Sequence, residues 1–211
     1  MSHPQVTRAT PADRPRVVET VVAAFDADPA FRYFFPDHAS FKDQAATFTG
    51  HLFDERVAVG AVWIIEGGSS VAMWDPPSPA AGNLSAAGGP TLDLPVDTLA
   101  RLAAYDAAVY GALPATPYWY LGIVATHPDR AGRGWGRALI AAGLARAAAD
   151  RMPAYLETTN RSNVAFYRRS GWEVTESVTV ETLTIWVMTH PAVGLGGHSG
   201  PTVAATADPP S

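Results

Sequence analysis

The chain of 211 residues contains no cysteine. That absence excludes disulfides, thiolate nucleophiles and zinc–thiolate sites. Charged residues are also scarce at 17%, Lys42 is the only lysine, and the formal net charge is −5. Nucleic-acid binding normally requires a basic face, so we expect no nucleic-acid partner.

Long apolar runs are lacking as well. No stretch of this sequence approaches the roughly 18–20 residues that a membrane-spanning helix requires, and the polar residues 1–15 contain no apolar segment of the signal-peptide type. We therefore expect a soluble cytoplasmic protein, monomeric or homodimeric, with no membrane partner. The apolar content of 47% is sufficient for one core. We predict one domain over residues 1–190 and a flexible tail over 191–211.

The spacing of apolar residues predicts strands and helices in a mixed order. One segment, residues 75–90, is rich in Pro, Gly, Ser and Ala and is typical of a flexible loop. The order predicts an α/β fold with a single mixed sheet and helices on both faces. The expected helices span 10–25, 40–57, 95–112, the stretch from the glycines at 132–136 to about 151, and 163–170, and the expected strands span 5–9, 58–65, 70–74, 118–126, 154–158, 174–180 and 183–189.

A turn with three alternate glycines, residues 132–136, follows the apolar strand predicted at 118–126 and leads directly into a helix. Free N–H groups at a helix N-terminus bind anions, and glycines allow the backbone to approach a ligand closely. Three arginines add positive charge to the turn: Arg130, Arg133 and Arg137. The turn therefore predicts a phosphate or pyrophosphate ligand, although glycines that merely pack a helix against a strand remain an alternative.

Known phosphate-binding motifs limit which ligand the turn can bind. A Walker loop is absent, because no Gly-Lys-Ser/Thr follows the glycines. The dinucleotide fingerprint G-x-G-x-x-G fails in both registers, since its last position falls on Arg137 or on Leu139. Glu157 lies about 20 residues further on, as the ribose-binding acid of that fold would, but the chain after it is too short for a doubly wound sheet. A nucleotide-dependent oxidoreductase is therefore disfavoured.

Two motifs in the same order resemble those of the GNAT superfamily of N-acetyltransferases. Residues 131–136, Ala-Gly-Arg-Gly-Trp-Gly, resemble its coenzyme-A pyrophosphate loop, with Ala131 where Gln or Arg is usual. Residues 163–172 resemble its downstream Asn-x-x-x-Tyr segment. The similarity is greatest to the puromycin N-acetyltransferase group and its actinobacterial relatives, over 10–37, 62–74, 118–163 and 186–189. It implies a GNAT fold with a splayed central sheet, acetyl-CoA as co-substrate and a role such as antibiotic resistance.

The resemblance also implies a coenzyme site. Backbone groups of Val124 and Thr126 would pair with the pantetheine arm, and the amides of the glycine turn would hold the pyrophosphate. Asn163 would bind the same arm, or alternatively cap a helix, and Arg133 and Arg137 could equally be solvated charges. The implied coenzyme-binding residues are Val124, Thr126, Ala131, Gly132, Arg133, Gly134, Trp135, Gly136, Arg137, Asn163 and Phe166.

Two residues are candidates for proton transfer in an attack of a primary amine on the thioester. A phenol can protonate the departing thiolate, which favours Tyr167 as general acid. Glu157 is the candidate general base, with His127 or a water chain as alternatives. Without a cysteine, direct attack is expected rather than an acyl-enzyme, and no metal is required.

The acceptor pocket is expected near the first helices. Asp26, Asp28 and Asp37 alternate there with aromatic residues, although most of these rings could simply form core. The predicted acceptor-binding residues are Asp28, Phe31, Trp119 and Tyr120. The sequence predicts an N-acetyltransferase acting on a small-molecule amine, and the alternative is a non-catalytic acyl-CoA-binding sensor on the same fold.

Overall fold

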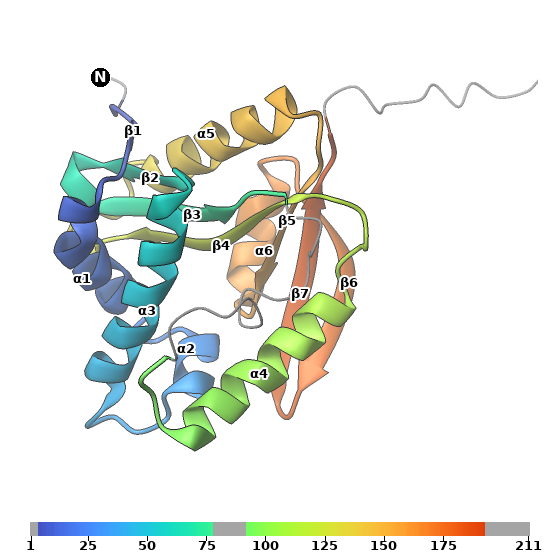
Figure 1. The fold of residues 1–211 in the computed structure, drawn as a ribbon. Helices are drawn as coiled ribbons and strands as arrows, with labels where there is room; N and C mark the ends of the chain where they lie inside the picture. The colour runs from blue at the N-terminus through green and yellow to red at the C-terminus, as the bar shows by residue number, and fades with distance from the viewer. Residues whose placement is uncertain (1–3, 78–91, 193–211) are drawn as a thin grey trace, which may run out of the picture.

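The computed structural model describes residues 4–77 and 92–192, which form a seven-stranded mixed sheet in the order β1-β2-β3-β4-β5-β7-β6 (Figure 1). Neighbouring strands are antiparallel except β4 and β5, which are parallel. The predicted mixed sheet is confirmed. The strands are β1 (Thr7–Arg8), β2 (Val62–Ile65), β3 (Ser70–Asp75), β4 (Trp119–Thr126), β5 (Ala154–Thr158), β6 (Glu173–Val180) and β7 (Leu183–His190).

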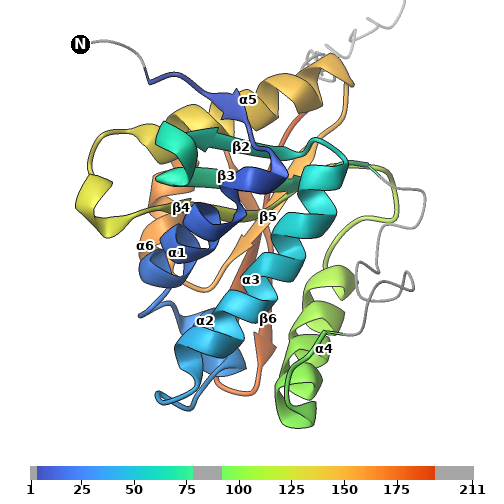
Figure 2. The ribbon, with the colours of Figure 1, turned by 60° about the vertical axis from the view of Figure 1, so that its left-hand side comes forward.

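Helices cover both faces of this sheet, as predicted (Figures 1 and 2). One buried cluster joins the sheet to α1, α2, α3 and α4, and a second joins its opposite face to α5 and α6. No helix within the described residues is both long enough and apolar enough to cross a bilayer. The helices are α1 (Arg14–Ala24), α2 (Pro29–Phe34), α3 (Phe41–Ala58), α4 (Val96–Gly111), α5 (Trp135–Ala149) and α6 (Arg161–Arg168).

The main differences from the sequence-based expectations concern α2, β2 and α6. Helix α2 is an additional element, because the sequence predicts no helix between 25 and 40. Asp28 instead caps a new helix and Pro29 occupies its first turn, where a missing N–H costs nothing. Strand β2 begins only at Val62 because α3 continues to Ala58. Helix α6 begins before Asn163, at Arg161. The predicted loop at 75–90 and the predicted tail fall largely outside the described residues.

The centre of the sheet is forked. Parallel pairing between β4 and β5 ends at Leu121 opposite Leu156, so residues 122–126 of β4 run on without a β5 partner. The β3–β4 register also shifts at this point, and the side chains of Leu121 and Ile123 therefore enter opposite buried clusters. A glycine inside a strand commonly marks such a bulge, and Gly122 lies here. The splayed sheet implied by the sequence resemblance is thus observed.

Helix α5 lies unusually close to the sheet. A Cβ atom on Gly143 would overlap the indole ring of Trp74 in β3. Both residues are buried, and Leu139 and Ile140 pack into the same cluster. Glycine at position 143 therefore lets the helix backbone rest directly on an aromatic side chain.

Candidate active site

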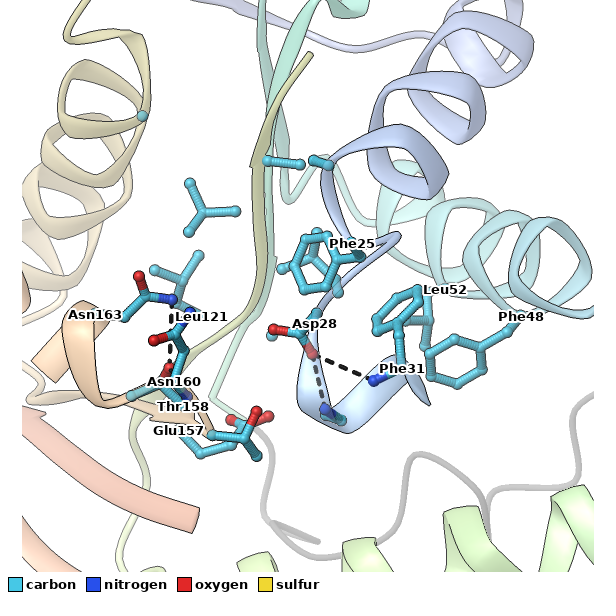
Figure 3. A pocket seen from close by; sticks show the side chains of 18 of the residues that line it. Phe25, Asp28, Phe31, Phe48, Leu52, Leu121, Glu157, Thr158, Asn160 and Asn163 are labelled. Atoms are coloured by element: carbon cyan, nitrogen blue, oxygen red, sulfur yellow. Dashed lines mark hydrogen bonds between the residues drawn. The ribbon is translucent and has the colours of Figure 1, made fainter. Parts of the chain in front are cut away.

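A cavity of about 1270 Å³ lies at the fork between β4 and β5. Its turn end is lined by residues 131–137, between β4 and α5, and its helical end is lined by side chains of α2, α3 and α4. Figure 3 shows the two walls near the fork, with Asn163, Thr158 and Glu157 facing Asp28, Phe25 and Phe31. The cavity therefore connects the predicted anion site with the predicted acceptor region.

The turn end offers free backbone donors. Within the described residues, no N–H group from Gly132 to Arg137 donates to a protein acceptor, and the first helical bond runs from Ala138 N–H to the Gly134 carbonyl. Gly132 and Gly134 have φ values of 78° and 75°, in the left-handed region that suits glycine. A Cβ on either would meet nothing within 4 Å, so the space around the turn is open. These features fit a diphosphate.

The arginines of the turn separate into two groups. Arg133 and Arg137 line the cavity, with the Arg133 guanidinium 5.3 Å from the Trp135 ring centroid and that of Arg137 5.9 Å from the Phe166 ring centroid. Arg130 instead approaches Glu66 at 3.9 Å and does not line the cavity. The predicted coenzyme residues Ala131, Trp135, Gly136 and Phe166 also line this end.

The backbone of β4 beyond the fork presents alternate residues to the cavity. His127 N–H donates to the Ser69 carbonyl, and the Ala125 carbonyl accepts from the Ser70 hydroxyl, so the odd-numbered residues direct their polar groups toward β3. In a strand the intervening residues face the other way. The peptide groups of Val124 and Thr126 therefore face the open fork, where an extended ligand chain could pair with them as an added strand would.

Asn163 lies in the first turn of α6 and lines the cavity, with its Nδ2 3.5 Å from Thr158 Oγ1. The alternative that Asn163 caps the helix is wrong. Asn160 is the cap, because its side chain accepts from Ser162 N–H and its carbonyl accepts from Asn163 N–H. Asn163 is thus free of the capping role and points its amide toward the ligand space (Figure 3).

Glu157 is the first β5 residue beyond the fork. Two tyrosine hydroxyls donate to its carboxylate, Tyr120 to Oε2 and Tyr105 to Oε1, the latter at 3.5 Å. Burial raises the pKa of Glu157 to about 7, and the Tyr120 hydrogen bond partly opposes that rise. A carboxyl group with a pKa near neutrality suits a general base. Tyr120, predicted to contact the acceptor, lines the cavity and also holds this carboxylate in place.

Tyr167 lies on α6 and lines the same cavity, although only 6% of the residue is exposed. Its ring packs edge-on against Phe166 and Trp172. Burial raises the pKa of Tyr167, and the charges of Glu157 and Asp28 raise it further. The phenol therefore retains its proton, which a donor to a departing thiolate must do.

The two carboxylate oxygens of Asp28 have different surroundings. Oδ1 accepts from Ala30 N–H at 2.9 Å and from Phe31 N–H at 3.2 Å, which caps α2, and Oδ2 makes no hydrogen bond with a described residue. Figure 3 shows the carboxylate between Phe25 and the fork. Burial raises the pKa of Asp28. Phe31 lines the cavity beside it while also packing in the buried cluster.

Three predicted acceptor-side residues lie elsewhere. Trp119 does not line the cavity, and that prediction is corrected. Its ring packs against Trp63 in the cluster on the α5 face, and its Nε1 donates to Asp150 at 3.0 Å. Asp26 pairs with Arg32, and Asp37 accepts from Ser40 at the start of α3, both at exposed positions.

Sequence reasoning missed the contribution of α3 and α4. Tyr105, Asp106, Val109 and Tyr110 line the helical end from α4, and Glu55 and Arg56 line it from α3. One signal was available for Asp106. It falls within the stripe formed by Leu102, Tyr105 and Val109, where a carboxylate interrupts the buried face of an amphipathic helix. No group of three or more potential metal ligands occurs over 4–77 and 92–192.

Comparisons with known proteins identify the fold. Residues 100–174 match the family model described as an acetyltransferase (GNAT) domain. A histone acetyltransferase HPA2 and related acetyltransferase from Corynebacterium glutamicum is 26% identical, with a TM-score of 0.64, covering 96% of this chain and 100% of that one.

More distant structures show the same fold. An agmatine N-acetyltransferase mutant is 12% identical, with a TM-score of 0.59, covering 89% of this chain and 98% of that one. A chain of the NatC complex bound to Gag peptide and CoA is 8% identical, with a TM-score of 0.54, covering 90% and 99%. The protein therefore has the GNAT acyl-CoA N-acyltransferase fold, which is the fold of acyl-CoA-dependent acetyltransferases.

Proposed function

Starting from this fold, we propose that the protein transfers an acetyl group from acetyl-CoA to a primary amine of a small molecule by direct attack. The observation that carries the proposal is the single cavity in which an amide-rich turn and a carboxyl group of near-neutral pKa meet at the fork. Acetyl-CoA would supply the activated acetyl group, with its diphosphate at residues 132–137 and its extended arm beside Val124 and Thr126.

The residues of the fork then divide the proton transfers. Glu157 accepts a proton from the ammonium group of the acceptor, directly or through water, which frees the nitrogen lone pair for attack. Tyr105 and Tyr120 orient that carboxylate through their hydroxyls. The Tyr167 hydroxyl donates its proton to the departing sulfur and is protonated again from solvent. No covalent enzyme intermediate forms, and the chain has no cysteine that would provide one.

The acceptor is a small molecule, an antibiotic or a metabolite, modified in the cytoplasm. Residues 10–37 and the two motifs resemble the puromycin N-acetyltransferase group. This resemblance supports an antibiotic as the acceptor. The size of the cavity and its aromatic helical end support an acceptor with an apolar body.

An acetyl-CoA turnover screen tests the function. Thiol release is measured with puromycin, aminoglycosides, polyamines, amino acids and peptide N-termini, each against an amine-free control. We expect amine-dependent release with at least one class, and acetyl-CoA density at the turn in soaked crystals. Coenzyme binding at the turn without release by any amine would indicate the sensor instead.

A further inference from the structure

The helical end of the cavity carries more negative than positive charge. Its carboxylates are Asp28, Glu55, Asp106 and Glu157, and its basic side chains are His51 and Arg56. Arg56 is already paired, because its Nη2 lies 2.7 Å from Asp75 and both side chains are buried. His51 lies 3.4 Å from Glu55. The remaining three carboxylates form no ion pair within the described residues.

Asp106 stands out among these carboxylates. It lies on α4 between Tyr105 and Val109, on the stripe that faces the cavity. Asp106 is half-buried on the cavity wall, and within the described residues it forms no ion pair and accepts no side-chain hydrogen bond, although a partly desolvated charge is normally paired. Burial raises the pKa of Asp106 to about 6, and nearby Arg56 opposes the rise. The group is therefore largely ionised at pH 8, where transfer would be measured.

A second observation, independent of the acidic groups, indicates that this cavity holds a ligand. The Tyr167 side chain is more than nine-tenths buried, lines the cavity and makes no hydrogen bond with any described residue. The hydroxyl oxygen is open to the cavity, where water or a bound molecule can form its hydrogen bond. The same cavity thus presents a hydroxyl at the fork and a carboxylate on α4, neither of which has a partner among the described residues.

The surroundings of these two groups define the shape of a ligand. Asp106 lies near the fork, because its charge adds to the effect of burial in raising the pKa of Glu157. Its neighbour Tyr105 reaches the fork, with its hydroxyl 3.5 Å from Glu157 Oε1. Aromatic rings of α2 and α3 line the wall around it, with the Phe34 and Tyr105 centroids 4.9 Å apart. An apolar segment between two cationic groups complements this arrangement.

We propose that the acceptor is a dication, whose reacting amine faces Glu157 and Tyr167 and whose second cationic group pairs with Asp106. The inference rests on the proposed acetyl transfer and specifies its substrate class as diamines or amine–guanidine compounds with a short apolar linker. Asp106 is then a specificity-determining residue, because it contacts the acceptor away from the reacting atoms.

Matched acceptors test the charge requirement. In 1,6-diaminohexane and heptylamine, or in 4-(aminomethyl)benzylamine and 4-ethylbenzylamine, a methyl group replaces the second ammonium with little change in shape. After correction for two equivalent amines, we expect kcat/KM to favour each diamine by about tenfold or more, equivalent to about 1.4 kcal/mol. A ratio near one for both pairs in an active enzyme overturns the inference.

Variants on one helix then assign the preference. Asp106→Asn should reduce the diamine preference to near one, and Asp106→Glu should retain part of it. Asp97→Asn removes a carboxylate from the exposed side of α4 and should leave the preference intact. A preference that survives Asp106→Asn overturns the assignment.

Two outcomes separate this inference from the proposed function. Absence of thiol release with every amine contradicts acetyl transfer itself. Release with monoamines and diamines alike supports the transfer but contradicts the dication. Should Asp106→Asn fail to fold, as judged by circular dichroism, the wild-type ratio for the matched acceptors still decides.

Discussion

The two ends of the cavity are built by different means. The turn end is contiguous, positively charged and made of backbone amides between Ala131 and Arg137. The helical end is assembled from α2, α3, α4 and β5, and it is negatively charged and made of side chains. Peptide groups can bind any diphosphate, whereas side chains can be exchanged to fit a particular acceptor. Variants should therefore separate coenzyme binding from acceptor choice.

The largest loss of activity is expected at Glu157, where the two ends of the cavity meet. Glu157→Gln preserves shape but removes the base, so kcat should fall by about 10²-fold or more, as is usual for positioned acid–base groups. Steady-state thiol release at saturating acetyl-CoA measures it. Glu173→Gln, at an exposed position of β6, is the matched control and should retain wild-type kcat. An unchanged kcat in Glu157→Gln would exclude this carboxylate as the base.

The pH profile sharpens the same point. Because burial raises the pKa of Glu157 to about 7, the carboxylate is protonated and inactive below that pH. We expect kcat/KM to rise with pH, to reach half its maximum near the pKa of about 7 and to level off about one unit above it, and the inflection should be lost in Glu157→Gln. The sign for stability is opposite. The folded state binds the proton more tightly, so this group destabilises the fold as pH rises from 4.5 to about 7.

A smaller loss of activity is expected when the hydroxyl of Tyr167 is removed. Tyr167→Phe retains the packing against Phe166 and Trp172 but lacks the hydroxyl. We expect kcat to fall by more than about tenfold with little change in the KM for acetyl-CoA. Tyr33→Phe, which removes an exposed hydroxyl near Glu181, serves as control. A variant with wild-type kcat would refute a role for Tyr167 in proton transfer.

Coenzyme binding at the turn end can be weakened without changing the helical end. Gly134→Ala places a side chain on a residue with φ of 75°, although the added Cβ meets no atom within 4 Å. The cost is therefore backbone strain of about 1–2 kcal/mol, and we expect about tenfold weaker coenzyme-A binding by calorimetry. Gly111→Ala, at the end of α4 with equally open space, should bind normally. A change in acceptor preference in Gly134→Ala would contradict the separation of the two ends.

The smallest of these effects is expected at Asp28, on the wall of the helical end. Asp28→Asn retains a good N-cap for α2 but removes the charge. We expect the KM for a cationic acceptor to rise by about threefold, a modest electrostatic contribution, with the KM for acetyl-CoA unchanged. Asp28→Ala should in addition lower stability by about 1 kcal/mol, since the cap is lost. An unchanged acceptor KM in Asp28→Asn would leave Asp28 with the capping role alone.

The same contrast explains what could be predicted from the sequence. The turn end depends on glycine spacing after a strand, which is local, and the structure has the strand, the turn and the helix where the pattern placed them. The helical end depends on which elements meet in space. Nothing in the spacing of Asp106 indicates that α4 lies against α2 and β6, although its place on an apolar stripe marks it as unusual.

The position of Trp119 shows a second limit. Residues 118–126 are almost uniformly apolar, so alternation does not reveal which side chains share a face. Trp119 and Leu121 enter one cluster, while Tyr120 and Ile123 enter the other because the strand shifts register between them. Gly122 indicates the bulge, but only the pairing with β3 fixes its position. Without the register between β3 and β4, the face of the sheet on which Trp119 lies could not be predicted.

The contact of Gly143 with Trp74 has a consequence for how coenzyme affinity can change. The indole holds the middle of α5 against β3, and the start of that helix supplies the exposed amides of the turn. Any side chain at position 143 must lift the helix or displace the ring, and so tilt those donors away from their target. Substitutions at this contact between α5 and β3 can thus weaken coenzyme binding at the turn, although position 143 does not contact the bound molecule.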